Sequence, residues 1–461
     1  MIGLSRIARS LAFAAMALPI IMAPVTSAAL PVADTVSVGR MEAVASSFER
    51  DGLFWGSVLI ARDGKPVLQR SYGFADAEWQ TRNTADTKFR IGSITKQFTA
   101  AAILILQEHG QLSLQDPVGK YLRDAPASWG RITIYNLLTH TSGLPNINAF
   151  EDYGSIRRVA AAPDQLIARF RDKPLEYEPG TKYSYGNSDY IVLGRLIEVV
   201  SGKSYAAFLQ QHIFDPLKMT STGVDDERAV VPLRAEGYAV TPNGIRHADA
   251  VSMTVPFSAG NLYSTVGDLF KWESALFAGR VVSLTSLKLM TTPFRKGYGL
   301  GLFIDDRDGH RVISHSGDID GFGGMLAYYP DDKLTVIVLS NLFGGAYGLV
   351  AKDMAKSAFG IPFVLPSERK VVAVPVTTLA EYAGTYKLTP TIANVITLTN
   401  GHLTSRIGNQ AELEMVPESP TMFFFRSGEA EVEFVRDPST GKVAHLIVHQ
   451  DGASFEGAKV D

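Results

Sequence analysis

Residues 89–99 read Phe-Arg-Ile-Gly-Ser-Ile-Thr-Lys-Gln-Phe-Thr, and the apolar run Ala-Ala-Ala-Ile-Leu-Ile-Leu follows at residues 100–106. The apolar run predicts a buried helix. Ser93 and Lys96 stand three residues apart at its start, so their side chains share one helical face. A lysine in this place can take the proton of the serine, and a helix N-terminus favours negative charge there. The stretch therefore predicts a nucleophilic serine site.

The Ser-x-x-Lys pattern alone is not specific, because the chain contains it twice. The second copy, Ser439-Thr440-Gly441-Lys442, follows Asp437-Pro438 and lies between two strand-like runs, which predicts a hairpin turn. A turn provides nothing that would hold its serine over a lysine. Ser93 therefore needs partners from elsewhere in the chain.

Composition narrows the class of protein. The chain has 461 residues, of which 46% are hydrophobic and 20% charged, so it has room for two or three domains. A formal net charge of -3 and the lack of a polybasic stretch argue against nucleic acid as a partner. No cysteine is present, which excludes disulfides and thiol catalysis. The nine histidines show no ligand spacing and no phosphate-binding loop occurs, so we expect neither a metal nor a cofactor.

Residues 1–29 have the order of a secretory signal peptide. Arg6 and Arg9 precede an apolar stretch from Leu11 to Met22, and small residues follow. The alternative is an uncleaved anchor, but the apolar stretch is short for a membrane span and prolines interrupt it. We expect cleavage near Ala28 or Ala29, no stable membrane span afterwards, and an exported protein that is periplasmic or secreted.

Strand and helix patterns predict a domain over residues 36–360 in which a sheet with flanking helices carries a helical insert. Two strand-like runs around Asp63-Gly64 predict a hairpin. Helical patterns dominate residues 112–278, and strand signals then return before a last helical pattern at 347–359. The predicted strands are 55–61, 66–73, 299–304, 311–314, 325–329 and 334–340.

Prolines at 362, 366 and 375 predict a linker over residues 361–376. Eight short strand-like runs without a helix follow, and they predict a small antiparallel β-barrel over residues 377–461. The runs are 381–387, 394–398, 402–407, 412–416, 422–426, 431–436, 443–449 and 453–457.

Tyr185-Gly186-Asn187 is the second candidate motif. A phenol that loses its proton in a cationic pocket can act as a base, and Lys96 would supply the charge. The Asn187 amide can hold both the lysine and a substrate carbonyl. The loop could also cap the following helix through Asn187 or Ser188, and both roles can hold at once.

The third candidate motif, His315-Ser316-Gly317-Asp318, ends a strand-like run. A strand edge with a glycine lets a substrate backbone lie alongside it. The amide N–H of Asp318 could pair with that of Ser93 as an oxyanion hole. The alternative is that His315 is an ordinary hydrogen-bonded histidine.

In this order, Ser-x-x-Lys, Tyr-x-Asn and His-x-Gly resemble the signature of the serine β-lactamase and penicillin-binding protein superfamily. The tyrosine is similar to that of class C β-lactamases and of the DD-peptidases, D-aminopeptidases and esterases of that group. The segments Leu137–Pro145 and Ala259–Thr265 resemble two further family segments. The resemblance covers about residues 36–360. It does not cover the C-terminal strands, although lipocalin-like appendages occur on members of the family.

The resemblance implies an α/β (α+β) fold, in which an antiparallel sheet is flanked by helices, with the site between the sheet and a helical insert. It implies that Ser93 is the nucleophile, that Lys96 and Tyr185 form the general-base pair, and that Asn187 positions groups. His315, Ser316, Gly317 and Asp318 would form the substrate strand and oxyanion site. β-Lactamases have a permanently charged lysine at the position of His315, whereas a histidine is mostly neutral at pH 7. This departure argues against efficient β-lactam turnover.

Three hypotheses for function stay open. The first is a penicillin-binding-type peptidase or amidase that acts on D-amino-acid-containing peptides, such as cell-wall peptides. The second is a carboxylesterase or a weak class C-like β-lactamase. The third is a slowly deacylating penicillin-binding sensor or scaffold, with the barrel as its interaction module. The sequence does not indicate the oligomeric state.

Overall fold

The computed structural model describes residues 38–241, 244–390, 392–408, 412–450 and 453–460, so the predicted signal peptide lies outside the described residues. The chain divides into two compact units. The first comprises Glu42–Val240 and Gly244–Met354, and the second includes residues 355–460. None of the described helices is long and apolar enough to span a membrane.

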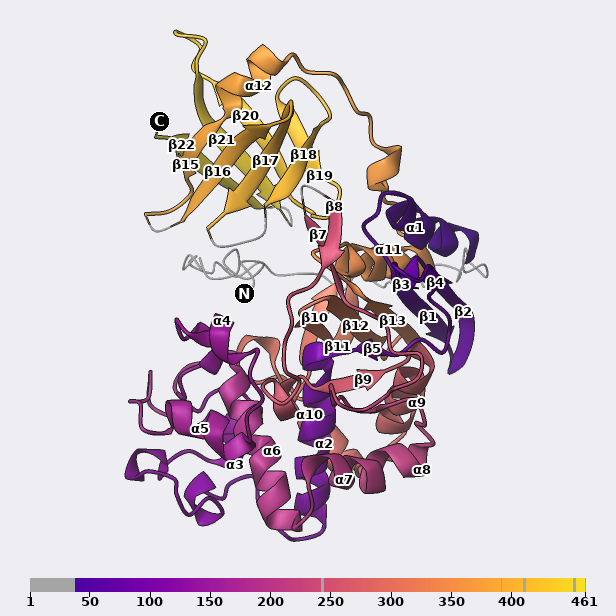
Figure 1. Ribbon diagram of the computed structural model, residues 1–461, viewed down its shortest axis with the longest axis vertical. Helices are drawn as coiled ribbons and strands as arrows, with labels where there is room; N and C mark the ends of the chain where they lie inside the picture. Colours follow the sequence, from indigo (N-terminus) through magenta and orange to yellow (C-terminus); the bar gives the residue numbers. More distant parts are fainter. Residues whose placement is uncertain (1–37, 242–243, 391, 409–411, 451–452, 461) are drawn as a thin grey trace, which may run out of the picture. The chain divides into compact units, whose positions relative to one another are not determined.

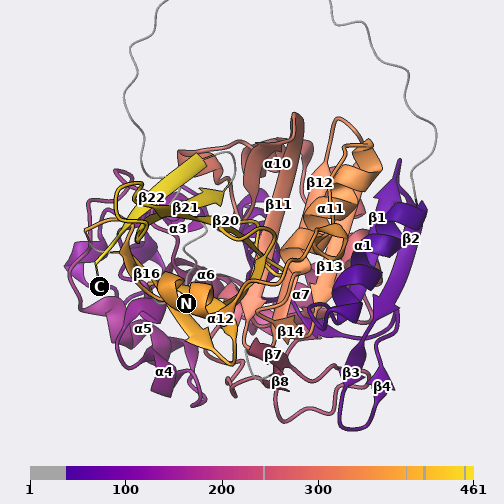
Figure 2. The same cartoon turned by 90° about the horizontal axis from the view of Figure 1, so that it is seen from above.

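A six-stranded antiparallel sheet in the order β10-β11-β12-β13-β1-β2 forms the centre of the first unit. Figure 2 shows β11, β12, β13, β1 and β2 side by side in this order. The predicted hairpin is confirmed: β1 pairs with β2 around Asp63 and Gly64, which both have positive φ. The strands are β1 (Gly56–Arg62), β2 (Lys65–Tyr72), β10 (Phe303–Arg307), β11 (His310–Ile319), β12 (Phe322–Tyr329) and β13 (Leu334–Ser340).

The predicted strand at 299–304 is wrong in position, because β10 begins only at Phe303. Residues 299–302 form a turn in which the Gly299 amide donates to the Leu302 carbonyl. Gly301 has a φ of +74°, and a Cβ there would lie 2.7 Å from the carbonyl oxygen of Lys96. The apolar residues of this turn therefore pack against a helix instead of pairing in the sheet.

The predicted buried helix is confirmed as α2, in which residues 95–106 are all buried. Figure 1 shows α2 in indigo beside α6, and the two helices are in contact. On its other side, Phe98 stacks on Trp272 with 4.0 Å between ring centroids. The helices are α1 (Val38–Arg50), α2 (Thr95–Glu108), α3 (Ile134–Leu138), α4 (Tyr153–Ile156), α5 (Pro163–Arg171), α6 (Asn187–Ser201), α7 (Tyr205–Leu209), α8 (Asp215–Leu217), α9 (Val266–Phe277), α10 (Leu284–Met290) and α11 (Tyr347–Phe359).

Short strands complete the first unit in three small sheets. They are β3 (Phe74–Asp76) with β4 (Thr81–Arg82); β5 (Phe89–Arg90), β9 (Leu262–Ser264) and β6 (Gly223–Val224); and β14 (Leu342–Phe343), β7 (Tyr238–Thr241) and β8 (Gly244–His247). Because β5 pairs with β9, the chain just before Ser93 is anchored to residues 262–264.

The second unit contains the predicted barrel, a closed antiparallel barrel of eight strands. The expectation of no helix is wrong, because α12 (Val376–Tyr382) precedes the first strand. Tyr382 of this helix stacks on Phe434 with 4.1 Å between ring centroids. The strands are β15 (Gly384–Lys387), β16 (Ala393–Thr399), β17 (His402–Ile407), β18 (Leu413–Pro417), β19 (Met422–Phe425), β20 (Glu431–Arg436), β21 (Val443–Gln450) and β22 (Ala453–Lys459).

The second Ser-x-x-Lys lies in the turn between β20 and β21, as predicted. The Ser439 hydroxyl donates to Asp437 Oδ1 at 2.5 Å, and the side chains are exposed. This serine takes part in an ordinary turn.

Glu273 of α9 is a buried acid in the core of the first unit. Burial raises the pKa of Glu273 to about 7, and hydrogen bonds from Thr335 and Ser274 oppose this rise only in part. The folded protein therefore keeps a proton that the unfolded chain loses above about pH 4.5. The stability due to this group is complete below pH 4.5 and falls as pH rises through about 7.

We expect Glu273→Gln to flatten this pH dependence, because glutamine does not ionise. The parent should lose about 3 kcal/mol between pH 4.5 and pH 8 through this group, and the variant should not. Urea unfolding of both proteins at pH 5 and pH 8 measures the difference. Identical pH dependence in the two proteins would contradict the raised pKa.

Candidate active site

Ser93 lies in a 3-10 turn, η2 (Gly92–Ile94), that runs directly into α2. Lys96 is fully buried in the first turn of α2. Its Nζ lies 2.9 Å from Ser93 Oγ, 2.8 Å from Asn187 Oδ1 and 2.9 Å from the carbonyl oxygen of Ala259. The structure thus brings together Ser93, Lys96 and Asn187, which were all predicted site residues. It adds the main-chain carbonyl of Ala259, a residue of the second family segment.

Burial lowers the pKa of Lys96 well below its usual value, and the Asp189 carboxylate opposes this only in part. An uncharged amine has two N–H donors and one lone pair. The oxygens of Asn187 and Ala259 can only accept, so they take the two donors. The lone pair is then left for the hydroxyl of Ser93. In its uncharged form Lys96 can therefore receive a proton from the serine, whereas in its charged form the three oxygens take its three N–H donors.

Asn187 is oriented by a loop that the motifs did not include. Its backbone N–H donates to Asn146 Oδ1 at 3.1 Å, and its Nδ2 donates to Asn148 Oδ1 at 2.9 Å. These bonds turn Oδ1 of Asn187 toward Lys96. The sequence analysis missed Asn146 and Asn148, whose only signal was their position just after the Leu137–Pro145 segment.

The alternative role of this loop as a helix cap is not found. The N-cap of α6 is Gly186, with no side-chain hydrogen bond at the cap. The Ser188 hydroxyl instead donates to the Pro145 carbonyl at 2.7 Å. Both Asn187 and Ser188 therefore tie the start of α6 to the 145–148 loop.

The Tyr185 ring faces Lys96, with 4.8 Å between Nζ and the ring centroid. It packs against the ring of His140, with 4.4 Å between centroids, and lies 6.1 Å from that of His315. The second and third motifs thus meet at Tyr185.

His140, which packs on Tyr185, belongs to a buried pair with Asp189. His140 Nδ1 lies 2.9 Å from Asp189 Oδ2, and the Ser142 hydroxyl donates to Asp189 Oδ1 at 2.5 Å. Burial raises the pKa of Asp189 well above its usual value. Asp189 was missed, because nothing in the sequence shows that it would pair with His140.

Strand β11 approaches the Ser93 turn at two glycines, Gly317 of the strand and Gly92 of the turn. A Cβ at Gly317 would lie 1.9 Å from the carbonyl oxygen of Ile91 and 3.1 Å from the amide nitrogen of Ser93. A Cβ at Gly92, whose φ is +48°, would lie 2.8 Å from the amide nitrogen of Asp318. Only glycine at both positions permits this approach, which brings the amides of Ser93 and Asp318 into one small region.

The far part of β11 extends beyond its neighbour β10. Pairing with β10 ends at Ser314, whereas pairing with β12 continues through residues 315–319. One edge of residues 315–319 is therefore not paired with β10. These residues include the third motif, His315-Ser316-Gly317-Asp318.

Comparison with models of known protein families assigns this chain to a family. A family model described as Beta-lactamase matches residues 48–358. The chain belongs to this family of serine hydrolases. A second family model, described as a domain of unknown function, matches residues 368–459.

Relatives of this β-lactamase family member include a penicillin-binding protein of Bacillus subtilis, which is 30% identical over 88% of this chain and 95% of the relative. A teichoic acid D-alanine hydrolase of Staphylococcus aureus is 31% identical over 64% of this chain and 72% of the relative. Among solved structures, an octameric penicillin-binding protein homologue from Pyrococcus abyssi is similar with a TM-score of 0.65 and 26% identity. That match covers 91% of this chain and 100% of the other.

His315 is turned into the protein. Its Nδ1 lies 2.6 Å from the carbonyl oxygen of Ser316, so Nδ1 carries a proton, and its Nε2 lies 3.3 Å from the Tyr298 hydroxyl. The exposed side chain at the end of this motif belongs to Asp318. Desolvation raises the pKa of Asp318 above its usual value, and the Tyr347 hydroxyl, 2.8 Å from both carboxylate oxygens, opposes this rise and favours a negative charge next to the Ser93 turn.

Proposed function

We propose that this member of the β-lactamase family cleaves D-amino-acid-containing peptides or amides through an acyl-enzyme on Ser93. The observation that carries the proposal is the fully buried Lys96 amine, 2.9 Å from the Ser93 hydroxyl, with its two other contacts taken by oxygens that only accept. Burial lowers the pKa of this lysine, which favours its action as the base for the neighbouring serine.

In the proposed reaction, Ser93 Oγ attacks the substrate carbonyl carbon while its proton passes to Lys96. The resulting oxyanion accepts hydrogen bonds from the amides of Ser93 and Asp318. The bond to the leaving amine then breaks, and the amine takes a proton from the pair formed by Lys96 and Tyr185. An ester remains on Ser93. Water attacks this ester, the base pair takes the water proton, and the acid leaves while Ser93 regains its proton.

Two observations favour a D-aminoacyl substrate over a β-lactam. One of the relatives is a teichoic acid D-alanine hydrolase. The second is the Asp318 carboxylate, which is held by Tyr347 beside the proposed oxyanion site. A β-lactam brings a carboxylate, as does the C-terminus of a D-Ala-D-Ala peptide, and this charge repels both, whereas a D-alanyl group with a free amine brings an ammonium, which it attracts.

A substrate panel tests this proposal. Purified protein is given a D-Ala-D-Ala peptide, D-alanine p-nitroanilide, a chromogenic ester and a chromogenic cephalosporin. We expect kcat/KM for the best D-aminoacyl substrate to exceed that for the cephalosporin by about tenfold or more, which corresponds to about 1.4 kcal/mol. A cephalosporin as the best substrate would overturn the proposed class. Stable labelling without turnover of any substrate would favour the slowly deacylating sensor.

We further propose that the protein is exported, because residues 1–29 have the order of a signal peptide. N-terminal sequencing of the protein from cells should find a chain that starts at about residue 29 or 30. A chain that starts at Met1 would contradict export by cleavage.

A further inference from the structure

The Ala259 carbonyl, which accepts a hydrogen bond from Lys96 Nζ at 2.9 Å, belongs to the short segment 257–261. The segment begins with a 3-10 turn, η7 (Phe257–Ala259), which contacts both α2 and α6. Phe257 has a φ of +40°, in the left-handed region that residues other than glycine rarely adopt. Such a backbone conformation persists only where the surrounding structure holds it. The contacts that hold this segment therefore also determine where the acceptor of Lys96 lies.

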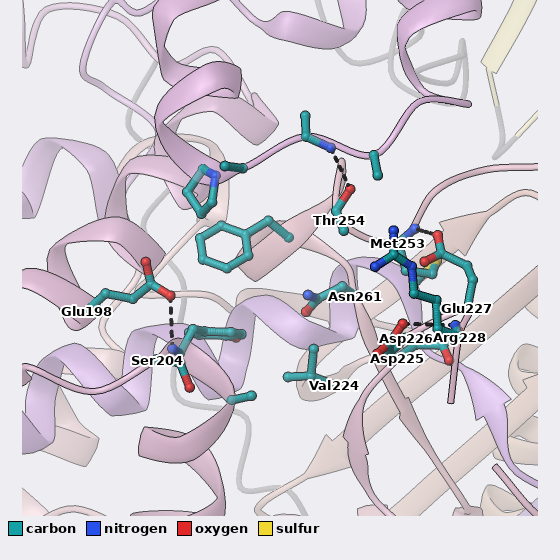
Figure 3. A pocket seen from close by; sticks show the side chains of 17 residues that line it. Glu198, Ser204, Val224, Asp225, Asp226, Glu227, Arg228, Met253, Thr254 and Asn261 are labelled. Atoms are coloured by element: carbon teal, nitrogen blue, oxygen red, sulfur yellow. Dashed lines mark hydrogen bonds between the residues drawn. The ribbon is translucent and has the colours of Figure 1, made fainter. Parts of the chain in front are cut away.

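One side of the segment is not filled by protein. Phe257 and Asn261 line a cavity of about 540 Å³, in which Figure 3 labels Asn261. Tyr205 lines the same cavity, with 5.3 Å between its ring centroid and that of Phe257. Because a cavity offers the backbone beside it few packing contacts, hydrogen bonds on the other sides contribute more to its position. On the side of α6, the Ser258 hydroxyl donates to the Tyr190 carbonyl at 2.7 Å.

Thr99 supplies the hydrogen bond on the side of α2. Its hydroxyl donates to the Ser258 carbonyl at 2.7 Å and lies 2.7 Å from the Tyr205 hydroxyl, whereas the Thr95 carbonyl is 3.5 Å away. Because the Thr99 hydroxyl has a single proton, Tyr205 is the donor between the two hydroxyls. Thr99, Ser258 and Tyr205 are all buried, so water does not replace a bond that is lost here.

The peptide group that joins Ser258 to Ala259 is held at both ends. Its carbonyl accepts from Thr99, and its N–H donates to the Pro256 carbonyl at 2.9 Å. A rotation of this peptide group would turn the next carbonyl, that of Ala259, away from Lys96. The Thr99 hydroxyl therefore controls an atom that it does not itself touch.

We infer that Thr99 is a positioning residue for Lys96, because its hydroxyl fixes the backbone that presents the Ala259 carbonyl to Nζ. The inference rests on the proposed function, in which Lys96 is the base for Ser93. The carbonyl favours the ammonium over the amine, because hydrogen bonds from charged donors are the stronger ones. It also takes one N–H of the amine, which leaves the lone pair for Ser93. Thr99 thus acts on the proton affinity and on the orientation of the base.

The titratable groups that face Lys96 come from α6 and from the loop before it. The rings of Tyr185 and Tyr190 have their centroids 4.8 Å and 5.5 Å from Nζ. The Asp189 carboxylate favours the ammonium. A substitution of Thr99 removes none of these groups, so a change in the titration of the base would report on the Ala259 carbonyl.

The rate at which a fluorophosphonate labels Ser93 of the full chain, measured as a function of pH, tests the inference. We expect Thr99→Val to lower the plateau rate by about 10- to 100-fold, because a misplacement of about 1 Å costs up to about 10²-fold. The acid limb should move to lower pH by about 0.5 to 1 pH unit, because the ammonium loses an acceptor that favoured it. Thr99→Ser keeps the hydroxyl and should restore both the plateau and the limb.

Thr222→Val is the matched control, because it removes a buried hydroxyl that donates to Asp268 at 3.0 Å. It should lower the Tm and leave the plateau and the acid limb unchanged. Thr99→Ala, which suits a helix, replaces the valine variant if that variant does not fold. An acid limb that stays in place in a folded Thr99 variant without the hydroxyl, or that moves equally in Thr222→Val, would overturn this inference alone. Absence of labelling in the parent would overturn the proposed function and this inference with it.

Discussion

Lys96→Met is expected to lower kcat/KM for the best substrate by about 10²- to 10⁴-fold, the range of a lost general base. Methionine keeps an unbranched apolar stem in the buried site but cannot accept the Ser93 proton. The variant should still fold, as judged by circular dichroism and thermal unfolding. Steady-state kinetics with the best substrate of the panel measures the loss.

The second Ser-x-x-Lys provides the matched control. Lys442→Met changes the same residue type in an exposed turn, and we expect unchanged kinetics. If Lys96→Met kept most of the activity, or if Lys442→Met lost it, the assignment of the base would be wrong.

The pH dependence of the parent reports on the same lysine. Because burial lowers the pKa of Lys96, the amine is uncharged and active above that lowered pKa, and it becomes protonated as pH falls through it. Single-turnover acylation should therefore fall on the acid side and reach a plateau well below pH 10.5. An acylation rate that keeps rising up to that pH would contradict a lowered pKa.

Gly317→Ala is expected to lower kcat by about 10²- to 10³-fold, as the loss of an oxyanion-hole donor does. The added methyl group would lie 1.9 Å from the carbonyl oxygen of Ile91, so β11 must move away from the Ser93 turn. That movement separates the amides of Ser93 and Asp318. KM should change less than kcat, because the lost contact is made mainly in the transition state.

Gly348→Ala in α11 is the matched control for this substitution, because a Cβ at Gly348 would meet no atom within 4 Å. We expect unchanged kinetics and slightly higher stability, since alanine favours a helix over glycine by about 1 kcal/mol. Full activity in Gly317→Ala would contradict the proposed oxyanion hole.

Local patterns predicted the elements whose residues alternate or repeat regularly. Strands β17 and β20 have the predicted bounds, 402–407 and 431–436, because apolar residues alternate along them and a turn ends each one. Helix α11 also has the predicted bounds, 347–359. The order of the three motifs was sufficient to indicate the family.

Tertiary contacts decided what local patterns did not. Helix α12 has three β-branched residues at its start, Val376-Thr377-Thr378, and follows a proline, so its sequence resembles a linker. Its Tyr382 ring lies on Phe434, a contact between segments far apart in sequence. Asn148 and the carbonyl of Ala259 were missed for the same reason, since a loop amide and a main-chain oxygen carry no motif. The lowered pKa of Lys96 also depends on burial by several elements.

Covalent labelling with a fluorophosphonate, followed by intact-mass measurement and peptide mapping, tests the central claim most directly. An activated serine displaces fluoride and keeps the phosphonyl group. We expect one adduct per chain, on the peptide that contains Ser93. The adduct should be absent in Ser93→Ala and unchanged in Ser439→Ala. Labelling of Ser439, or a full adduct in Ser93→Ala, would show that Ser93 is not the nucleophile.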